Sequence, residues 1–394
     1  MAIAVLFKKM GAAEGIHRFY ILISYFLWFL PVLNVRFSSE TWSGLFFLFS
    51  IGVIKLPFKK KILQFGLAGV LAGVSFLCRF QSAILISTFI FWLIFQNKNC
   101  IKDIFIFIIS IFPIILIGVI IDSWFYGNIV FTPWNYFYSN IVLNTASHFG
   151  ISPWYYYLVI IITKPILVIG VLIILCIFIV TYQRPKSLLV WLLIPFLVIH
   201  SLIPHKEDRF LFPVINFLPL IIVLGWQELK TIFKAQRNNV FFRFLISFFI
   251  GTLLVINTFG LLIMAFKPMG NGVKVLTQYI YRNYHNKPVI LIYDQETKLY
   301  SPFINLKERS YEDKNVIEIP FQYFILHSNS SIIKDSSLLF VFEKAKIHYP
   351  DYAQVIQRFS LKPKIQSIPQ WIESLGKYYS ASNDIDALVL YGSQ

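Results

Sequence analysis

Long apolar runs alternate with short polar turns over the first 266 residues of the chain. Because about 20 apolar residues cross a bilayer as a helix, runs of this length are typical of membrane spans. The pattern predicts about nine helices, near residues 19–33, 43–57, 62–78, 80–96, 104–121, 155–180, 188–203, 210–226 and 244–266. Several runs are shorter than about 18 residues, so the pattern does not fix the helix ends.

The pattern changes after residue 266. Lys267–Gly272 is a turn-rich linker, and the following residues have the mixed polarity of a soluble domain. Val273–Tyr284 predicts a helix, whereas Val289–Tyr293 and Leu338–Phe342 predict buried strands. The expected organisation is a multi-pass region at residues 1–266 and a small α/β domain at residues 267–394.

Composition supports the membrane assignment. Of the 394 residues, 57% are hydrophobic and 14% are charged. An ordinary soluble domain carries about 25% charged residues, so that class is excluded. The predicted fold class is an all-α polytopic membrane protein with a small C-terminal α/β domain outside the cytoplasm.

The net charge of +16 could indicate a nucleic-acid partner, but its distribution argues against one. Lysines and arginines gather in alternate loops, around residues 8–18, 55–61, 98–102, 184–186 and 230–243. The intervening loops carry Arg36, Arg79, Lys206 and Arg209. By the positive-inside rule the first set of loops is cytoplasmic, and the loops near 34–42, 122–154 and 204–209 lie on the other side with the tail. The basic excess is therefore a topology signal, and no nucleic-acid partner is predicted.

The strongest chemical signal is a polar segment between two apolar runs. Four residues of this segment, His205, Lys206, Glu207 and Arg209, could form an anion clamp with an acid or base beside it. A charge at the bilayer centre costs roughly 2.5–3.5 kcal/mol, so the segment must lie at an interface or line a wet cavity. The alternative is a hairpin tip whose charges cap helices.

Three more polar residues interrupt the apolar pattern. Arg79 and Gln81 lie at a hairpin on the same side, where an arginine can bind a lipid phosphate or extend to the headgroups. Lys164 precedes Pro165 within an apolar run and either faces a cavity or marks a kinked helix.

The loop from Asp122 to Trp154 is rich in aromatic residues, which favours an interfacial helix lying on the membrane. Asp122, with Glu40, Glu207 and Asp208, is among the few acids on the non-cytoplasmic side of the membrane region. Any of the four could act as a general base. For Asp122, a helix cap or turn is the alternative.

Several of these segments together resemble a known family. His205–Pro213 resembles the His-Lys-Glu-x-Arg-Phe-Leu-x-Pro signature of the Alg9-like mannosyltransferases, glycosyltransferase family 22. The stretches 122–127, 132–140 and 149–158 are similar to the aromatic loop of the branch that acts in GPI-anchor assembly. Arg79-Phe80-Gln81 follows in the expected order, and the similarity runs from about residue 20 to residue 266.

The resemblance implies a multi-pass enzyme of the GT-C type with its site on the non-cytoplasmic face. It implies inverting transfer of mannose from a polyprenyl-phosphate donor (dolichyl phosphate in eukaryotes) to a lipid-linked glycan or GPI-type glycolipid. The membrane would be the endoplasmic reticulum in a eukaryote or the plasma membrane in a bacterium. The implied substrate-binding residues are His205, Lys206, Glu207, Arg209, Arg79, Gln81, Tyr126, Asn135 and Trp154. No metal or cofactor is implied.

One departure from the family pattern leaves the catalytic base open. The family begins with an outer loop that carries an Asp-Glu pair, whereas this chain resembles a point after that loop. We therefore expect an N-terminally truncated chain, in which Asp122 and Glu207 are the remaining candidates for the base. Two alternatives stay open: a transporter or flippase of an anionic lipid or glycan, and an inactive truncated paralogue.

Overall fold

A computed structural model describes residues 14–35, 37–96, 100–267, 272–285, 287–294, 315–327, 337–376, 379 and 387–393. Arg36 lies outside these residues. The chain divides into two compact units, Met1–Leu261 and Leu262–Gln394.

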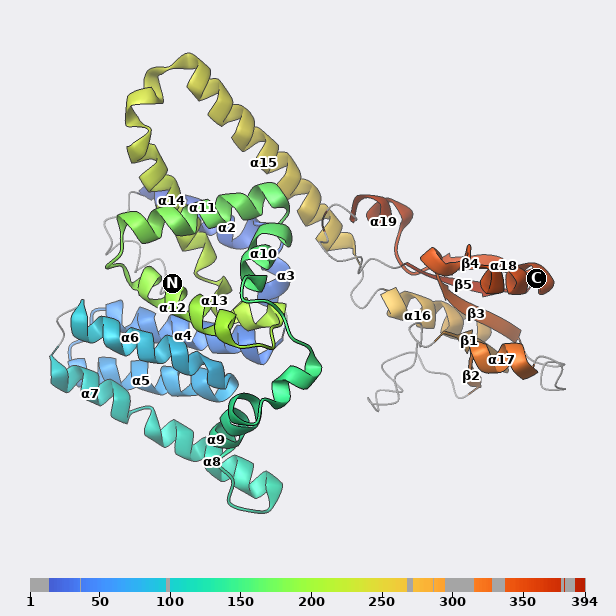
Figure 1. Ribbon diagram of the computed structural model, residues 1–394, viewed down its shortest axis with the longest axis horizontal. Coiled ribbons are helices and arrows are strands. Elements are labelled where there is room, and N and C mark those ends of the chain that lie inside the picture. Colours follow the sequence, from blue (N-terminus) through green and yellow to red (C-terminus); the bar gives the residue numbers. More distant parts are fainter. Residues whose placement is uncertain are drawn as a thin grey trace. The chain divides into compact units, whose positions relative to one another are not determined.

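The first unit is helical (Figure 1). Its α-helices are α2 (Glu14–Phe26), α3 (Leu30–Val35), α4 (Ser39–Lys55), α5 (Lys61–Cys78), α6 (Ala83–Phe95), α7 (Ile101–Ile109), α8 (Phe112–Tyr126), α9 (Thr132–Phe137), α10 (Tyr156–Thr163), α11 (Leu167–Gln183), α12 (Leu188–Leu202), α13 (Phe212–Ile215), α14 (Leu218–Ile232) and α15 (Val240–Phe266), the last of which continues into the second unit. Short 3-10 or π turns are η1 (Phe80–Ser82), η2 (Tyr138–Val142), η3 (Thr145–Phe149), η4 (Asp208–Leu211) and η5 (Lys234–Asn238).

Each predicted apolar run contains helix, but several runs are broken into shorter pieces. Among the described residues, three helical stretches are long and apolar enough to cross a membrane: Lys61–Cys78, Ile101–Tyr126 and Val240–Phe266. A bent pair, Asp208–Ile215 with Leu218–Ile232, would make a fourth. The molecule is an integral membrane protein by this criterion, whereas the larger number of spans stays a prediction.

The expected span at residues 155–180 is two helices. α10 ends at Thr163 and α11 begins at Leu167, with Pro165 between them and Ile166 at a φ of 76°. Proline cannot continue the hydrogen-bond ladder, so the break falls where the sequence predicts a kink.

Small residues set the packing of the first helices. Gly69 and Gly73 of α5 face α7 and α8 so closely that a Cβ at residue 73 would lie 2.8 Å from Ile114. This spacing is the close-approach pattern of membrane helices. α4 and α5 are joined by two buried hydrogen bonds, from Ser43 Oγ to the Ser75 carbonyl (2.9 Å) and from Ser75 Oγ to the Ser43 carbonyl (2.8 Å). These contacts bring the start of α4 beside the end of α5.

The second unit contains a five-stranded sheet in the order β2-β1-β3-β5-β4. Its elements are α16 (Val273–Tyr284), β1 (Val289–Tyr293), β2 (Val316–Pro320), α17 (Phe321–His327), β3 (Ser337–Glu343), η9 (Lys344–Lys346), α18 (Pro350–Arg358), β4 (Lys362–Gln366), α19 (Gln370–Gly376) and β5 (Leu388–Gly392). β1 pairs in parallel with β2 and β3, and β5 is antiparallel to β3 and β4.

The central strands β1, β3 and β5 are buried on both faces. Alternate side chains of β1 and β3 join separate apolar clusters, Leu291 and Leu339 with Leu276 of α16, and Ile292 and Phe340 with other residues on the opposite face. Because successive side chains of a strand point to opposite faces, two-sided burial produces the continuous apolar runs seen in the sequence. The helix Val273–Tyr284 and the strand Val289–Tyr293 have the bounds that the sequence predicts.

Candidate functional site

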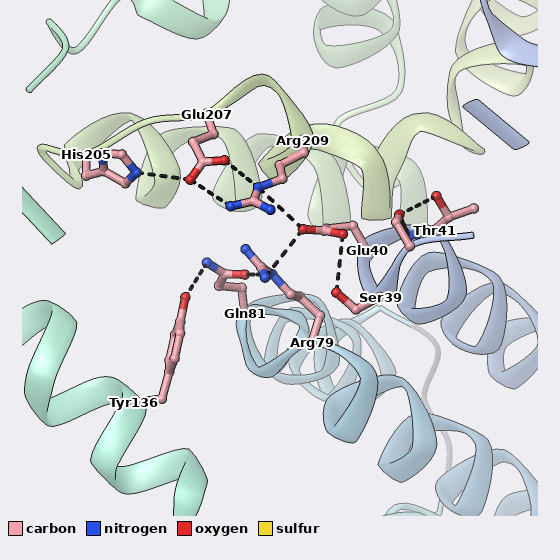
Figure 2. A network of polar contacts seen from close by, with 10 residues as sticks. Ser39, Glu40, Thr41, Arg79, Gln81, Tyr136, His205, Glu207 and Arg209 are labelled. Atoms are coloured by element: carbon pink, nitrogen blue, oxygen red, sulfur yellow. Dashed lines mark hydrogen bonds and ion pairs between the residues drawn. The ribbon is translucent and has the colours of Figure 1, made fainter. Parts of the chain in front are cut away.

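The polar segment after α12 is extended, and this conformation sorts its side chains. Glu207 has φ −133° and ψ 148°, so neighbouring side chains point to opposite sides of the chain. His205, Glu207 and Arg209 lie together on one side (Figure 2), whereas Lys206 and Asp208 leave in other directions. The charged run therefore has two parts. His205, Glu207 and Arg209 form a network of contacts, and Lys206 and Asp208 contact other parts of the chain.

Glu207 is held by its two neighbours in the network. Its Oε1 accepts a hydrogen bond from Arg209 Nη2 at 2.9 Å and lies 3.1 Å from His205 Nε2. Arg209 Nε also pairs with Glu207 Oε2. These contacts, foremost the hydrogen bond from Arg209, lower the pKa of Glu207 below its ordinary value, so the group is a carboxylate at neutral pH.

His205 faces two hydrogen-bond acceptors. Its Nδ1 lies 3.0 Å from the carbonyl oxygen of Gly150, and its Nε2 faces the carboxylate of Glu207. The ring is thereby held between the Gly150 carbonyl and the Glu207 carboxylate, beside the Arg209 guanidinium.

Glu40, in the first turn of α4, lies between two arginines from distant parts of the chain. Its Oε1 is 3.4 Å from Arg79 Nη1 and 3.8 Å from Arg209 Nε (Figure 2). The Glu40 side chain is 4% exposed, whereas those of Arg79 and Arg209 are 18% and 51% exposed. The buried carboxylate therefore supports two cations that are more accessible than itself.

Arg79 caps the end of α5 and extends the network toward α9. Its Nε donates to Gln81 Oε1, and Gln81 Nε2 lies 3.1 Å from the Tyr136 hydroxyl. The Arg79 guanidinium also stands over the Phe210 ring, 5.2 Å from its centroid. A substrate-binding role for Arg79 and Gln81 stays a prediction, and sequence reasoning gave Tyr136 no role.

Lys206 contacts backbone oxygens and not Glu207 or Arg209 in the contacts described here, so its expected part in an anion clamp stays a prediction. The residue is 6% exposed, and its Nζ donates to the carbonyl oxygens of Ser152 (2.9 Å) and Ile203 (2.6 Å). Burial lowers its pKa. Lys206 thereby joins the 149–156 loop to the end of α12, which favours a structural role.

We expect Lys206→Met to destabilise the protein more than it weakens anion binding. The methionine leaves the two carbonyl oxygens without their donor, which costs about 1–3 kcal/mol for each buried group left unsatisfied. A lowered thermal midpoint with near-normal affinity for a phosphate ligand is the expected result in detergent. Loss of phosphate affinity at an unchanged midpoint would contradict the structural role.

Asp208 joins the segment to α10 and to the helix break that follows it. Its Oδ1 accepts from the Tyr156 hydroxyl at 2.7 Å, and its Oδ2 lies 3.3 Å from Lys164 Nζ. For Lys164, the sequence left two interpretations open, a side chain facing a cavity or a kinked helix. In the structure Lys164 lies at a helix break and pairs with Asp208 of this polar segment.

The remaining candidates lie outside the network as it stands. Asp122 lies within α8 and does not open the loop, because the helix continues to Tyr126. Tyr126, Asn135 and Trp154 are exposed. In the contacts described above, neither these three residues nor Asp122 contacts Glu40, Arg79 or Arg209. A substrate-binding role for Tyr126, Asn135 and Trp154 stays a prediction.

Glu40 is the member that sequence reasoning named but did not place. It was one of four acids considered as a base, and its only local signal is an acid in the capped first turn of a helix, Ser38-Ser39-Glu40-Thr41. The described residues contain no group of three or more potential metal ligands. What the arrangement offers is a surface of cations suited to a phosphate group.

Comparisons with known proteins place this site in context. The model of the Alg9-like mannosyltransferase family matches residues 1–296. No solved structure matches significantly.

Three relatives show how far the similarity extends. "GPI alpha-1,2-mannosyltransferase 3" of Danio rerio is 29% identical over 31% of this chain and 22% of its own. "GPI mannosyltransferase 3" of Debaryomyces hansenii is 30% identical over 42% and 29%. A "probable Dol-P-Man:Man(7)GlcNAc(2)-PP-Dol alpha-1,6-mannosyltransferase" of Schizosaccharomyces pombe is 23% identical over 79% and 55%. The matched part of this chain thus spans between 22% and 55% of the length of these relatives.

Proposed function

Because the chain belongs to the Alg9-like mannosyltransferase family, we propose that it transfers mannose from a polyprenyl-phosphate donor to a lipid-linked glycan or GPI-type glycolipid. The relatives above are named as mannosyltransferases, so they give no support to a transporter or flippase. The membrane would be the endoplasmic reticulum in a eukaryote or the plasma membrane in a bacterium.

The observation that supports this function best is that Arg79 and Arg209 both approach the same oxygen of Glu40. In the proposed reaction the bond between the anomeric carbon and the phosphate oxygen breaks, and the phosphate leaves with the electron pair. The acceptor hydroxyl oxygen forms the new bond and loses its proton. Preorganised cations beside the leaving phosphate stabilise the charge that develops on it.

Neither of the two remaining candidates for the base, Glu207 and Asp122, is well placed. Glu207 already contacts Arg209 through both oxygens, and its lowered pKa makes it a weak proton acceptor. Asp122 lies in α8, outside the network. We therefore assign Glu207 the holding of Arg209 and His205 in place.

The loops that meet at the network are those that the charge distribution places outside the cytoplasm. Contacts join Glu40, Arg79, Gly150, Ser152 and the 205–209 segment. Elsewhere in the same unit, the expected cytoplasmic loops meet each other, since Trp92 Nε1 donates to the Lys186 carbonyl and Lys55 Nζ stands over the Trp92 ring. This grouping supports an extracytoplasmic site.

The test is a transfer assay in membranes that contain the full chain. We expect labelled mannose to pass from a polyprenyl-phosphate donor to a lipid acceptor fraction and not to pass from a nucleotide sugar. Membranes without the chain and membranes with Glu207→Gln are the controls, the latter with strongly reduced transfer. Equal transfer from the nucleotide sugar, or none from the lipid donor, would contradict the proposed function.

A further inference from the structure

Glu40 is placed where a substrate cannot reach it. Its side chain is 4% exposed, and the Ser39 hydroxyl donates to its Oε2 at 3.2 Å. Its other oxygen faces the two guanidiniums. A residue so covered cannot bind the donor directly, so any effect on the reaction must pass through Arg79 and Arg209.

Two local features hold Glu40 in this place. Ser38 caps α4, with Thr41 N donating to Ser38 Oγ at 3.2 Å. The reciprocal hydrogen bonds of Ser43 and Ser75 fix the start of α4 against the end of α5, and Arg79 is the residue that directly follows α5. A fixed helix terminus gives a carboxylate a defined position, which a side chain on a loop would lack.

The two arginines need such a carboxylate in order to lie together. Arg79 comes from the end of α5, and Arg209 comes from η4, so no local backbone constraint pairs them. Two guanidiniums that approach the same carboxylate oxygen repel each other, because both carry a positive charge. Glu40 offsets this repulsion because one of its oxygens lies near both guanidiniums.

We propose that Glu40 is a positioning residue that holds Arg79 and Arg209 side by side as one phosphate-binding unit. The inference rests on the proposed function, because it assumes a donor that carries a phosphate. It adds the residue on which the geometry of that subsite depends.

The sign of the effect of Glu40→Gln distinguishes positioning from simple charge balance. Removing a negative charge near a phosphate subsite should strengthen phosphate binding if only the net charge matters. If Glu40 aligns the arginines, the same change weakens binding, because the guanidiniums separate and no longer present their donors to one phosphate. The variant keeps the size of the side chain, so packing is nearly constant.

The measurement is equilibrium binding of farnesyl phosphate and of farnesol to the purified full chain in detergent. Farnesol lacks the phosphate and reports the apolar contribution. We expect the wild type to prefer the phosphate, and Glu40→Gln to weaken phosphate binding at least 10-fold while farnesol binding is unchanged. Glu40→Asp keeps the charge but is shorter, so it should resemble Glu40→Gln.

Two further variants keep the test decisive. Glu228→Gln removes a carboxylate from another ion pair, with Arg184 Nε at 2.6 Å, and should leave phosphate binding unchanged. Ser39→Ala removes the hydroxyl that donates to Glu40 and should weaken phosphate binding about 2- to 5-fold, as expected for a single hydrogen bond of about 0.5–1 kcal/mol. Ser39→Ala therefore serves if Glu40→Gln does not fold.

The outcomes separate this inference from the proposed function. A wild type that binds farnesol as well as farnesyl phosphate would overturn both. A wild type that prefers the phosphate, together with Glu40→Gln or Ser39→Ala variants that bind it equally or more tightly, would overturn the positioning role alone.

Discussion

Replacing Arg209 with alanine is expected to lower transfer by about 100- to 1,000-fold, the range observed when one preorganised donor to a developing charge is removed. Arg209 is the most exposed cation of the network, at 51% of its side chain, and is therefore the one best placed to meet a donor phosphate. Its pairing with Glu207 aligns the guanidinium without covering it.

Folding should survive this substitution. An ion pair that is half exposed contributes about 0–1 kcal/mol to stability, because solvent screens it. The thermal midpoint of Arg209→Ala should therefore stay near that of the wild type, while kcat falls with little change in the expression or insertion of the chain. Arg243→Ala, at an exposed position of α15, is the matched control and should retain full transfer.

Arg209→Lys adds a test of geometry. Lysine keeps the charge but cannot contact a carboxylate and a phosphate with a planar fork of donors. We expect lysine to restore transfer only in part, with a remaining loss on the order of 10-fold or more. Recovery of wild-type transfer with lysine would show that the charge alone matters and would contradict the role assigned to the guanidinium. The measurement is the transfer rate at saturating donor, compared with the rate at low donor.

The sequence predicted the positions of the apolar helices well, because a membrane imposes a strong and continuous requirement for apolar side chains. It predicted their continuity less well. Prolines lie at both breaks: Pro165 stands between α10 and α11, and Pro31 is the second residue of α3, directly after the break from α2 near Leu27–Phe29. Hydropathy does not record such breaks, because proline does not lower the apolar character of a run enough to divide it.

The candidate site was predicted in part for a similar reason. His205, Glu207 and Arg209 are close in sequence, and their mixed charge marks them as a group. Lys206 shares that signal, yet it points the other way because the segment is extended. Glu40 meets Arg209 only through the packing of α4 on α13, a contact between segments far apart in the chain that no charge pattern reveals.

Gly44 is the residue at which this packing is most sensitive, and Gly44→Ala is expected to impair both stability and transfer. A Cβ at residue 44 would lie 2.5 Å from the Pro213 carbonyl oxygen and 2.9 Å from Pro213 Cα. These are backbone atoms, so no side-chain rotation relieves the clash, and α4 must move away from α13. Overpacking of this kind costs about 1–3 kcal/mol.

The same movement should separate Glu40 from Arg209, because both lie within about one helical turn of the clash. Because Glu40 and Arg209 are already 3.8 Å apart, a small shift breaks this ion pair and leaves the carboxylate paired with Arg79 alone. We therefore expect Gly44→Ala to lower the thermal midpoint and to reduce transfer at least 10-fold. Gly251→Ala is the control, since a Cβ at that position of α15 has nothing within 4 Å and alanine favours the helix by about 0.5–1 kcal/mol. Should Gly44→Ala keep the wild-type midpoint and rate, the close approach of α4 to α13 would not be what holds the two arginines together.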